Sequence, residues 1–206
     1  MPDSLNLKRT YVILSLCYLA FVIYGSFIPF QFRPLPIAEA IDRFYRIPYL
    51  HLGIQSRADF IANILLYIPL SFFLIGALCK KTHSLAIKCA ATLFVFILCI
   101  LIAGLIEFIQ VFFPPRTVSL NDVIAEILGT IIGIVFWYTI GGRLTRLWSA
   151  ISAGGREGLQ AALVIYALFY LALCLFPFDF ILSRSELSWK LATNSYHAFV
   201  AEETCQ

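Results

Sequence analysis

The sequence predicts an all-α fold, a polytopic bundle of about five transmembrane helices with short interfacial helices on its outer face. Of its 206 residues, 61% are hydrophobic and only 13% are charged, whereas soluble domains average about 25% charged residues. Several apolar runs also reach the length of about 20 residues that a helix needs to cross a bilayer. We therefore expect an integral membrane protein, and the small net charge of +3 gives no reason to expect a nucleic-acid partner.

The apolar runs divide the chain into three parts. Residues 1–10 are expected to form a cytoplasmic N-terminus, and residues 11–142 the main transmembrane domain. Residues 143–206 are expected to form an inner basic loop, a fifth span and an outer C-terminal segment. The predicted spans cover residues 11–30, 60–79, 85–113, 123–141 and about 158–178. The first run exceeds the roughly 7–15 residues of a signal-peptide core and no A-x-A site follows it, so we expect it to stay uncleaved.

Basic residues set the expected orientation, because Lys and Arg are enriched in cytoplasmic loops. The Lys80-Lys81 pair directly follows the second predicted span, and Arg143 and Arg146 follow the fourth. We therefore place the N-terminus in the cytoplasm and, with five spans, the C-terminus outside. Two segments of the outer face have the amphipathic pattern of interfacial helices, Ile37–Tyr45 and Ser185–Asn194.

Two ten-residue segments, SRADFIANIL and SLNDVIAEIL, share the pattern S-x-x-D-x-I-A-x-I-L at the start of the second and fourth spans. Each carries two polar residues four apart, and therefore on one helix face: Asp59 with Asn63, and Asp122 with Glu126. A structural explanation is open, because S-x-x-D at a helix start matches a capping box. Asn63 and Glu126, however, lie one turn inside the span, where polar groups are costly and usually line a cavity or pair with one another.

Further polar residues are expected at the same depth, because an antiparallel bundle brings the end of the third span to the same outer end. We call the whole set the outer polar cluster: Arg57, Asp59, Asn63, Glu107, Gln110, Arg116, Asp122 and Glu126. Ionisable groups inside a membrane usually mark a functional site, so the cluster predicts a pocket that opens outward. Ala125, Gly129 and Gly133 form a stripe of small residues on the fourth span, which lets another helix approach closely.

No motif in the sequence identifies a reaction. The chain has no G-x-S-x-G, H-E-x-x-H or P-loop pattern. His51, His83 and His197 lie in separate loops and no cysteines have C-x-x-C spacing, so we expect neither a metal site nor a cofactor. Catalysis stays open only because neighbouring carboxyl groups can divide the roles of acid and base.

The order and spacing of these polar residues resemble those of the VanZ-like family of bacterial membrane proteins. The likeness covers residues 24–138 and rests on Asp59-x-x-x-Asn63, Pro69, Glu107-x-x-Gln110, Arg116, Asp122 and Gly129-x-x-x-Gly133. Where the family pattern usually has an Asn four residues after the second Asp, this chain has Glu126. The resemblance implies a multi-pass protein of the bacterial cytoplasmic membrane, and the family's founding member is linked to low-level resistance to the glycopeptide teicoplanin. It implies no assigned reaction.

Three functions remain open on the sequence. In the first, the outer pocket binds or excludes an envelope lipid, a lipid-linked intermediate or a glycopeptide, and membrane lipids are partners. In the second, the protein is a membrane enzyme that modifies such a lipid. In the third, it is a small proton-coupled transporter, although the polar groups lie near one face and transporter sites lie near the midplane. The pattern favours the first.

Overall fold

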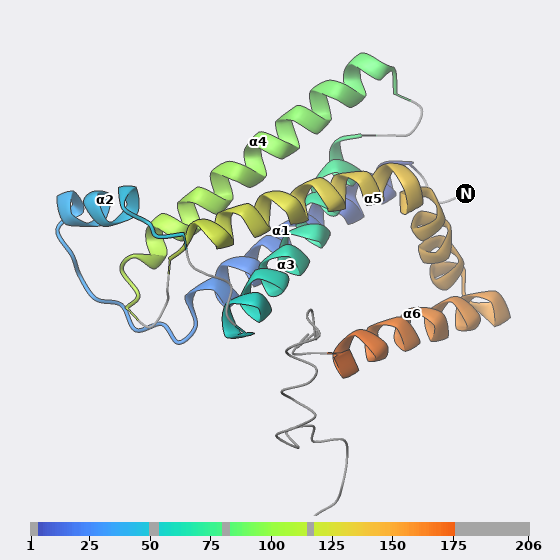
Figure 1. The fold of residues 1–206 in the computed structure, drawn as a ribbon. Helices are drawn as coiled ribbons and strands as arrows, with labels where there is room; N and C mark the ends of the chain where they lie inside the picture. The colour runs from blue at the N-terminus through green and yellow to red at the C-terminus, as the bar shows by residue number, and fades with distance from the viewer. Residues whose placement is uncertain (1–3, 50–53, 80–82, 115–117, 176–206) are drawn as a thin grey trace, which may run out of the picture.

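The computed structural model describes residues 4–49, 54–79, 83–114 and 118–175, and all regular secondary structure in these ranges is helical. The all-α prediction is therefore confirmed. The helices, in chain order, are α1 (Ser4–Phe27), α2 (Ile37–Tyr45), α3 (Ile54–Leu78), α4 (Leu85–Gln110), α5 (Leu120–Ala153) and α6 (Gly155–Leu175). Figure 1 shows α1, α3, α4 and α5 running alongside one another, with α2 at one end of them and α6 standing apart.

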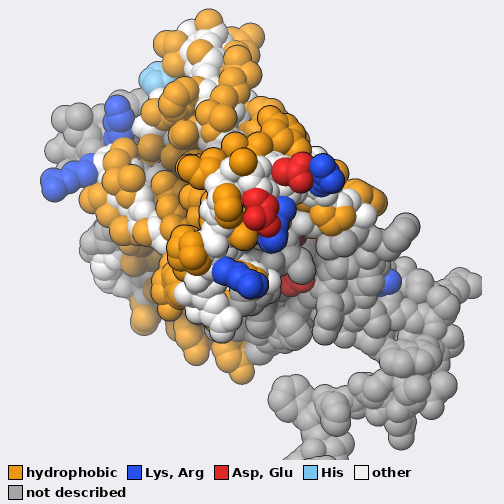
Figure 2. Space-filling view, turned by 90° about the vertical axis from the view of Figure 1, so that its left-hand side faces the viewer, with side chains coloured by type: hydrophobic (Ala, Val, Ile, Leu, Met, Phe, Trp, Pro, Cys, Tyr) orange, Lys and Arg blue, Asp and Glu red, His pale blue; other side chains and the backbone are white. Residues whose placement is uncertain are grey.

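Four of these helices, α1, α3, α4 and α5, are long and apolar enough to cross a membrane. Their outward side chains are largely hydrophobic, and hydrophobic side chains cover much of the described surface in Figure 2. Leu16 on α1 and Leu101 on α4, for example, are 62% and 64% exposed. Apolar surface of this extent is far larger than the patches that soluble monomers expose, so the chain is a multi-pass membrane protein.

Helix α5 differs most from its predicted span. It is 34 residues long, continues past residue 141 and turns the region predicted as a basic loop into helix as far as Ala153. One reason is a tertiary contact, because the Tyr11 hydroxyl of α1 hydrogen-bonds Thr145 Oγ1 at 3.0 Å and holds the extension against the bundle. The helix ends at Gly154, whose φ of 73° is one that glycine adopts readily.

The other helix ends differ from the prediction by smaller amounts. Helix α1 begins at Ser4 instead of residue 11 and ends at Phe27 instead of residue 30. Helix α4 ends at Gln110 instead of residue 113. A physical reason for the earlier end of α4 is that Phe113 precedes a proline, and the residue before a proline is disfavoured in helical conformation.

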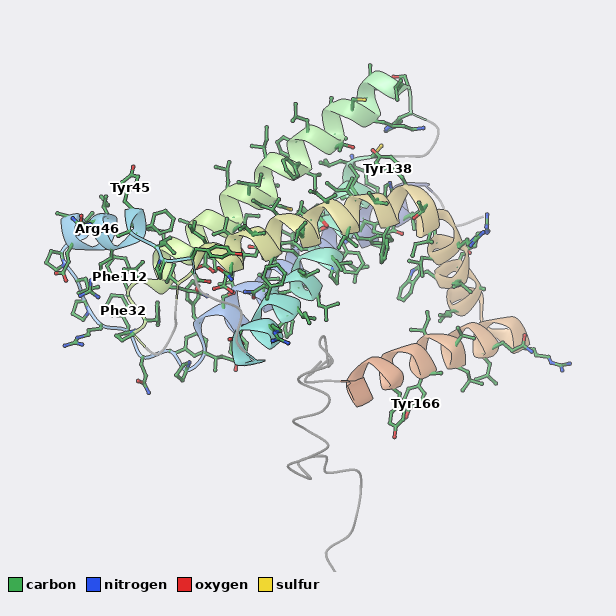
Figure 3. The ribbon with its side chains drawn as sticks, in the orientation of Figure 1. Phe32, Tyr45, Arg46, Phe112, Tyr138 and Tyr166 are labelled. Carbon is green, nitrogen blue, oxygen red and sulfur yellow. The ribbon has the colours of Figure 1, made fainter. Side chains whose placement is uncertain are left out.

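The fifth predicted span falls largely on α6. Its described apolar segment is Gly158–Ala167, and among the described elements it packs against α5 alone. Figure 3 shows Tyr166 of α6 pointing away from the other helices. Residues 176–178 and the predicted interfacial segment 185–194 lie outside the described residues, so the five-span topology stays a prediction.

The centre of the bundle is the contact between α3 and α5, which is the most extensive contact of the described helices. Gly129 and Gly133 make it possible. A Cβ on Gly129 would overlap the carbonyl oxygen of Ile64, and one on Gly133 would overlap the carbonyl oxygen of Ile68 and Ser71 Oγ. Ala125, in the turn above, is fully buried. The small-residue stripe therefore lies against α3, so that the first turns of the two helices also lie close together.

Helix α2 has the bounds expected for the interfacial helix. Its exposed side carries two i,i+4 ion pairs, Glu39–Arg43 at 2.7 Å and Asp42–Arg46 at 2.9 Å. Adjacent acidic and basic side chains are visible at this end of the molecule in Figure 2. On its other side Ala40 is buried, and the Phe44 ring meets that of Phe108 on α4 edge-on at 5.5 Å.

The connection that carries α2 is tied to the turn between α4 and α5. The backbone N–H of Arg33 donates to the carbonyl oxygen of Phe112 at 2.8 Å, and that of Leu120 donates to Pro48 at 3.2 Å. The rings of Phe32 and Phe112 stack with their centroids 6.0 Å apart, and Figure 3 labels both residues at this end of the molecule. These contacts hold the helix ends together at the end of the bundle where the outer polar cluster is expected.

Candidate functional site

A cavity of about 350 Å³ lies at this end of the bundle and is lined by α1, α3, α4 and α5. Its walls contain most of the outer polar cluster: Asp59, Asn63, Glu107, Gln110, Asp122 and Glu126. Arg57, in the first turn of α3, is half-buried and is not among the residues that line the cavity. Arg116 lies outside the described residues. The structure thus brings the predicted acids and amides of three helices around one space.

Asp122 joins α5 to α3. Its Oδ1 accepts a hydrogen bond of 2.7 Å from Nδ2 of Asn63, and its Oδ2 accepts one of 2.6 Å from Ser119 Oγ. Ser119 is also the N-cap of α5, because its Oγ accepts from the backbone N–H of Asp122 at 3.3 Å. Asp122 therefore both takes part in capping α5 and lines the cavity. Ser56 does not occupy the equivalent N-cap position, because α3 already begins at Ile54.

Two acids of the cavity are almost completely buried. Glu107 of α4 is 2% exposed and Glu126 of α5 is 3% exposed. Glu126 Oε2 has no well-aligned hydrogen-bond partner among the described residues, although the Tyr67 hydroxyl of α3 interacts with the same carboxyl group. Leaving a buried polar atom without a partner costs about 1–3 kcal/mol, and such atoms are rare enough in native structures to call for an explanation.

Helix α1 supplies residues that the sequence analysis did not include. Gly25 and Ser26 line the cavity, and Gln110 Nε2 of α4 donates to the carbonyl oxygen of Ser26 at 3.0 Å. The Ser26 hydroxyl is used within its own helix, where it donates to the carbonyl oxygen of Val22 at 2.8 Å. The only sequence signal was a glycine and a small polar residue where the first span ends.

Tyr67 was also missed. It lies on α3 one turn below Asn63 and is fully buried, and its hydroxyl has no well-aligned hydrogen-bond partner among the described residues. The hydroxyl interacts directly with the carboxyl group of Glu126 and lies within electrostatic range of Glu107. Polar groups therefore continue below the cavity toward the α3–α5 contact.

The arrangement does not resemble a metal centre. In the described ranges, no group of three or more His, Cys, Asp or Glu side chains is placed to hold a metal ion. The acids are instead distributed around the walls of the cavity, on three different helices.

A bundle of membrane-spanning helices with acids and amides around a cavity at one end defines the class: a polytopic all-α membrane protein with a polar site between its helices. A family model described as VanZ/LLP1 matches residues 11–141, which is more than half of the chain and includes every residue named above as lining the cavity. The chain therefore belongs to the VanZ/LLP1 family, and the resemblance found in its polar residues is confirmed. The comparisons with curated proteins and with solved structures gave no match.

Proposed function

We propose that this protein acts in the bacterial cell envelope by holding the polar head group of a lipid, a lipid-linked intermediate or a glycopeptide in its polar cavity. The observation that carries the proposal is the buried carboxyl group of Glu126, whose Oε2 has no well-aligned hydrogen-bond partner among the described residues, in the wall of a cavity that four apolar helices line. An amphipathic ligand suits both the polar cavity and the apolar surface of the helices. Its polar group would lie in the cavity and its hydrocarbon chain against the outside of the helices.

The size of the cavity limits what can enter. Its volume of about 350 Å³ lies at the lower end of the range of roughly 300–1,000 Å³ that is typical of small-molecule sites. One head group or one sugar unit fits such a space, whereas a complete glycopeptide does not. For a glycopeptide, the proposal is therefore that a single polar substituent occupies the cavity.

The proposal places the cavity on the outer side of the cytoplasmic membrane. Single cysteines replacing Arg43 and Lys81, in a variant without the native cysteines, test this orientation. Arg43 lies on α2 at the cavity end and its side chain is 55% exposed. In intact cells a membrane-impermeant thiol reagent is expected to label position 43 and to leave position 81 unlabelled until the membrane is permeabilised. The reverse pattern would place the cavity in the cytoplasm.

Gly25 offers a way to block the cavity without disturbing the helices. It lines the cavity, and a Cβ built on it meets no atom within 4 Å. The side chain of Gly25→Leu therefore has room to enter the cavity. We expect this variant to fold as the parent does and to lose most of the lipid that co-purifies with the parent, measured by mass spectrometry of the detergent-solubilised protein.

Gly104→Leu is the matched control, because a Cβ on Gly104 also meets no atom within 4 Å and Gly104 does not line the cavity. It should retain the parent's lipid. Equal retention by Gly25→Leu and Gly104→Leu would contradict the proposal. In cells, the same two variants are compared for envelope-lipid composition and teicoplanin susceptibility, and only Gly25→Leu should resemble a strain that lacks the protein.

A further inference from the structure

We infer that the cavity selects a ligand group rich in hydrogen-bond donors, the hydroxyls of a sugar or the N–H groups of an ammonium, and rejects a phosphate. This inference rests on the proposed function, since it assigns a chemical class to the head group in the same cavity. It follows from the hydrogen-bonding capacity that the protein leaves unused on the cavity walls.

The donors on the walls are largely committed to the protein itself. Asn63 Nδ2 donates to the Asp122 carboxyl group, and Gln110 Nε2 donates to the backbone carbonyl of Ser26. A carbonyl oxygen can only accept, and so can an ionised carboxylate, so these partners fix which end of each amide is the nitrogen. The Ser26 hydroxyl hydrogen is committed to Val22. Each amide keeps one N–H for a ligand.

Several other acceptors on the walls remain available within the described ranges. The side-chain oxygens of Asn63 and Gln110 have no hydrogen-bond partner in the described part of the chain, and neither does the Asp59 carboxyl, which is exposed. Glu126 Oε2 is buried and has no well-aligned partner there, although the Tyr67 hydroxyl interacts with the same carboxyl group. Among the described residues, the available acceptor oxygens on the walls therefore outnumber the two remaining amide N–H groups. A ligand that satisfies them has to bring hydrogens.

A phosphate would bring further acceptor oxygens to walls that need donors. Phosphate sites supply Arg or Lys side chains or several backbone N–H groups, and no Lys or Arg side chain of the described ranges lines this cavity. Phosphate oxygens would instead lie beside carboxyl oxygens in surroundings of low dielectric constant, where repulsion between like charges is strong.

Two matched pairs of lipids test the inference on the full-length protein in detergent. Phosphatidylethanolamine and phosphatidylcholine have the same phosphate, which the inference leaves outside the cavity, but only the first has N–H donors on the terminal group that would enter it. A glucosyl diacylglycerol and its O-methylated form have the same ring, but only the first has O–H donors. We expect the donor lipid of at least one pair to bind about tenfold more tightly in a native mass spectrometry titration, since a hydrogen bond to a charged group contributes roughly that factor. The pair that shows the preference identifies ammonium or sugar as the source.

The variant Asp59→Leu removes an acceptor that has no protein partner in the described ranges, and it should reduce the preference without lowering the melting temperature. Equal binding within both pairs overturns the inference. If Gly25→Leu then still abolishes binding of all four lipids, the proposed head-group site stands and only its donor preference is wrong. If Gly25→Leu leaves lipid binding unchanged, the proposed function fails, and the inference with it.

Discussion

Gly133→Ala is expected to melt at a clearly lower temperature than the parent protein in detergent, although alanine is a better helix former than glycine by about 1 kcal/mol. The added Cβ would overlap Ser71 Oγ and the carbonyl oxygen of Ile68 on α3. The serine side chain can rotate away, but the carbonyl belongs to the helix backbone and yields only if α3 and α5 separate. Overpacking of this kind costs about 1–3 kcal/mol, and separation of the helices also loses the contacts around the site.

The matched control is Gly104→Ala on α4, where the new Cβ meets no atom within 4 Å. Gly104→Ala gains helix propensity, and its new Cβ overlaps no other atom, so its melting temperature should equal or exceed that of the parent. Thermal unfolding followed by circular dichroism compares the two variants under one set of conditions. If both melt alike, Gly133 does not form the close contact with α3.

Asp122→Ala is the second substitution with a large expected effect, a loss of about 2–4 kcal/mol in the free energy of unfolding. The aspartate accepts from both Asn63 Nδ2 and Ser119 Oγ, and Ser119 is only 2% exposed. Removing the carboxyl group leaves both donors without this partner, at a cost of about 1–3 kcal/mol for a buried donor. Asp122→Asn keeps one acceptor oxygen and should lose about half as much.

A surface aspartate provides the comparison. Asp42→Ala breaks an ion pair with Arg46 whose side chains are 57% and 77% exposed, and exposed pairs contribute at most about 1 kcal/mol. A double-mutant cycle with Asn63→Ala then isolates the link between α3 and α5, for which we expect a coupling of roughly 0.5–3 kcal/mol. Additive effects of Asn63→Ala and Asp122→Ala would show that the hydrogen bond between them contributes nothing.

The sequence predicted the four long apolar helices and α2 well because both depend on local properties. The length of an apolar run decides whether it can cross a bilayer, and the positions of Ile37, Ile41 and Phe44 decide which face of a short helix is apolar. The far end of α5 could not be predicted in the same way. Its extension past residue 141 is held by the hydrogen bond between Tyr11 and Thr145, 134 residues apart in the chain.

The candidate site likewise combines residues that local sequence predicts with residues that only the packing of the helices brings in. The internal repeat placed Asp59, Asn63, Asp122 and Glu126 at one depth, and the structure finds all of them around one cavity. Gly25, Ser26 and Tyr67 carry no charge, and inside an apolar run they look like ordinary membrane residues. Their role depends on which helices become neighbours, and a single sequence does not contain that information.

The bonds of Asp122 and the glycine contact below it have a consequence for recognition. Because Ser119 and Asn63 hold the Asp122 carboxyl from two sides, and the backbones of α3 and α5 touch at Gly129 and Gly133, these two walls are ordered before any ligand arrives. A ligand that enters then gives up its own freedom of motion, while the protein gives up little. Similar ligands should reach such a preorganised site at comparable rates, and the difference between them should lie in residence time.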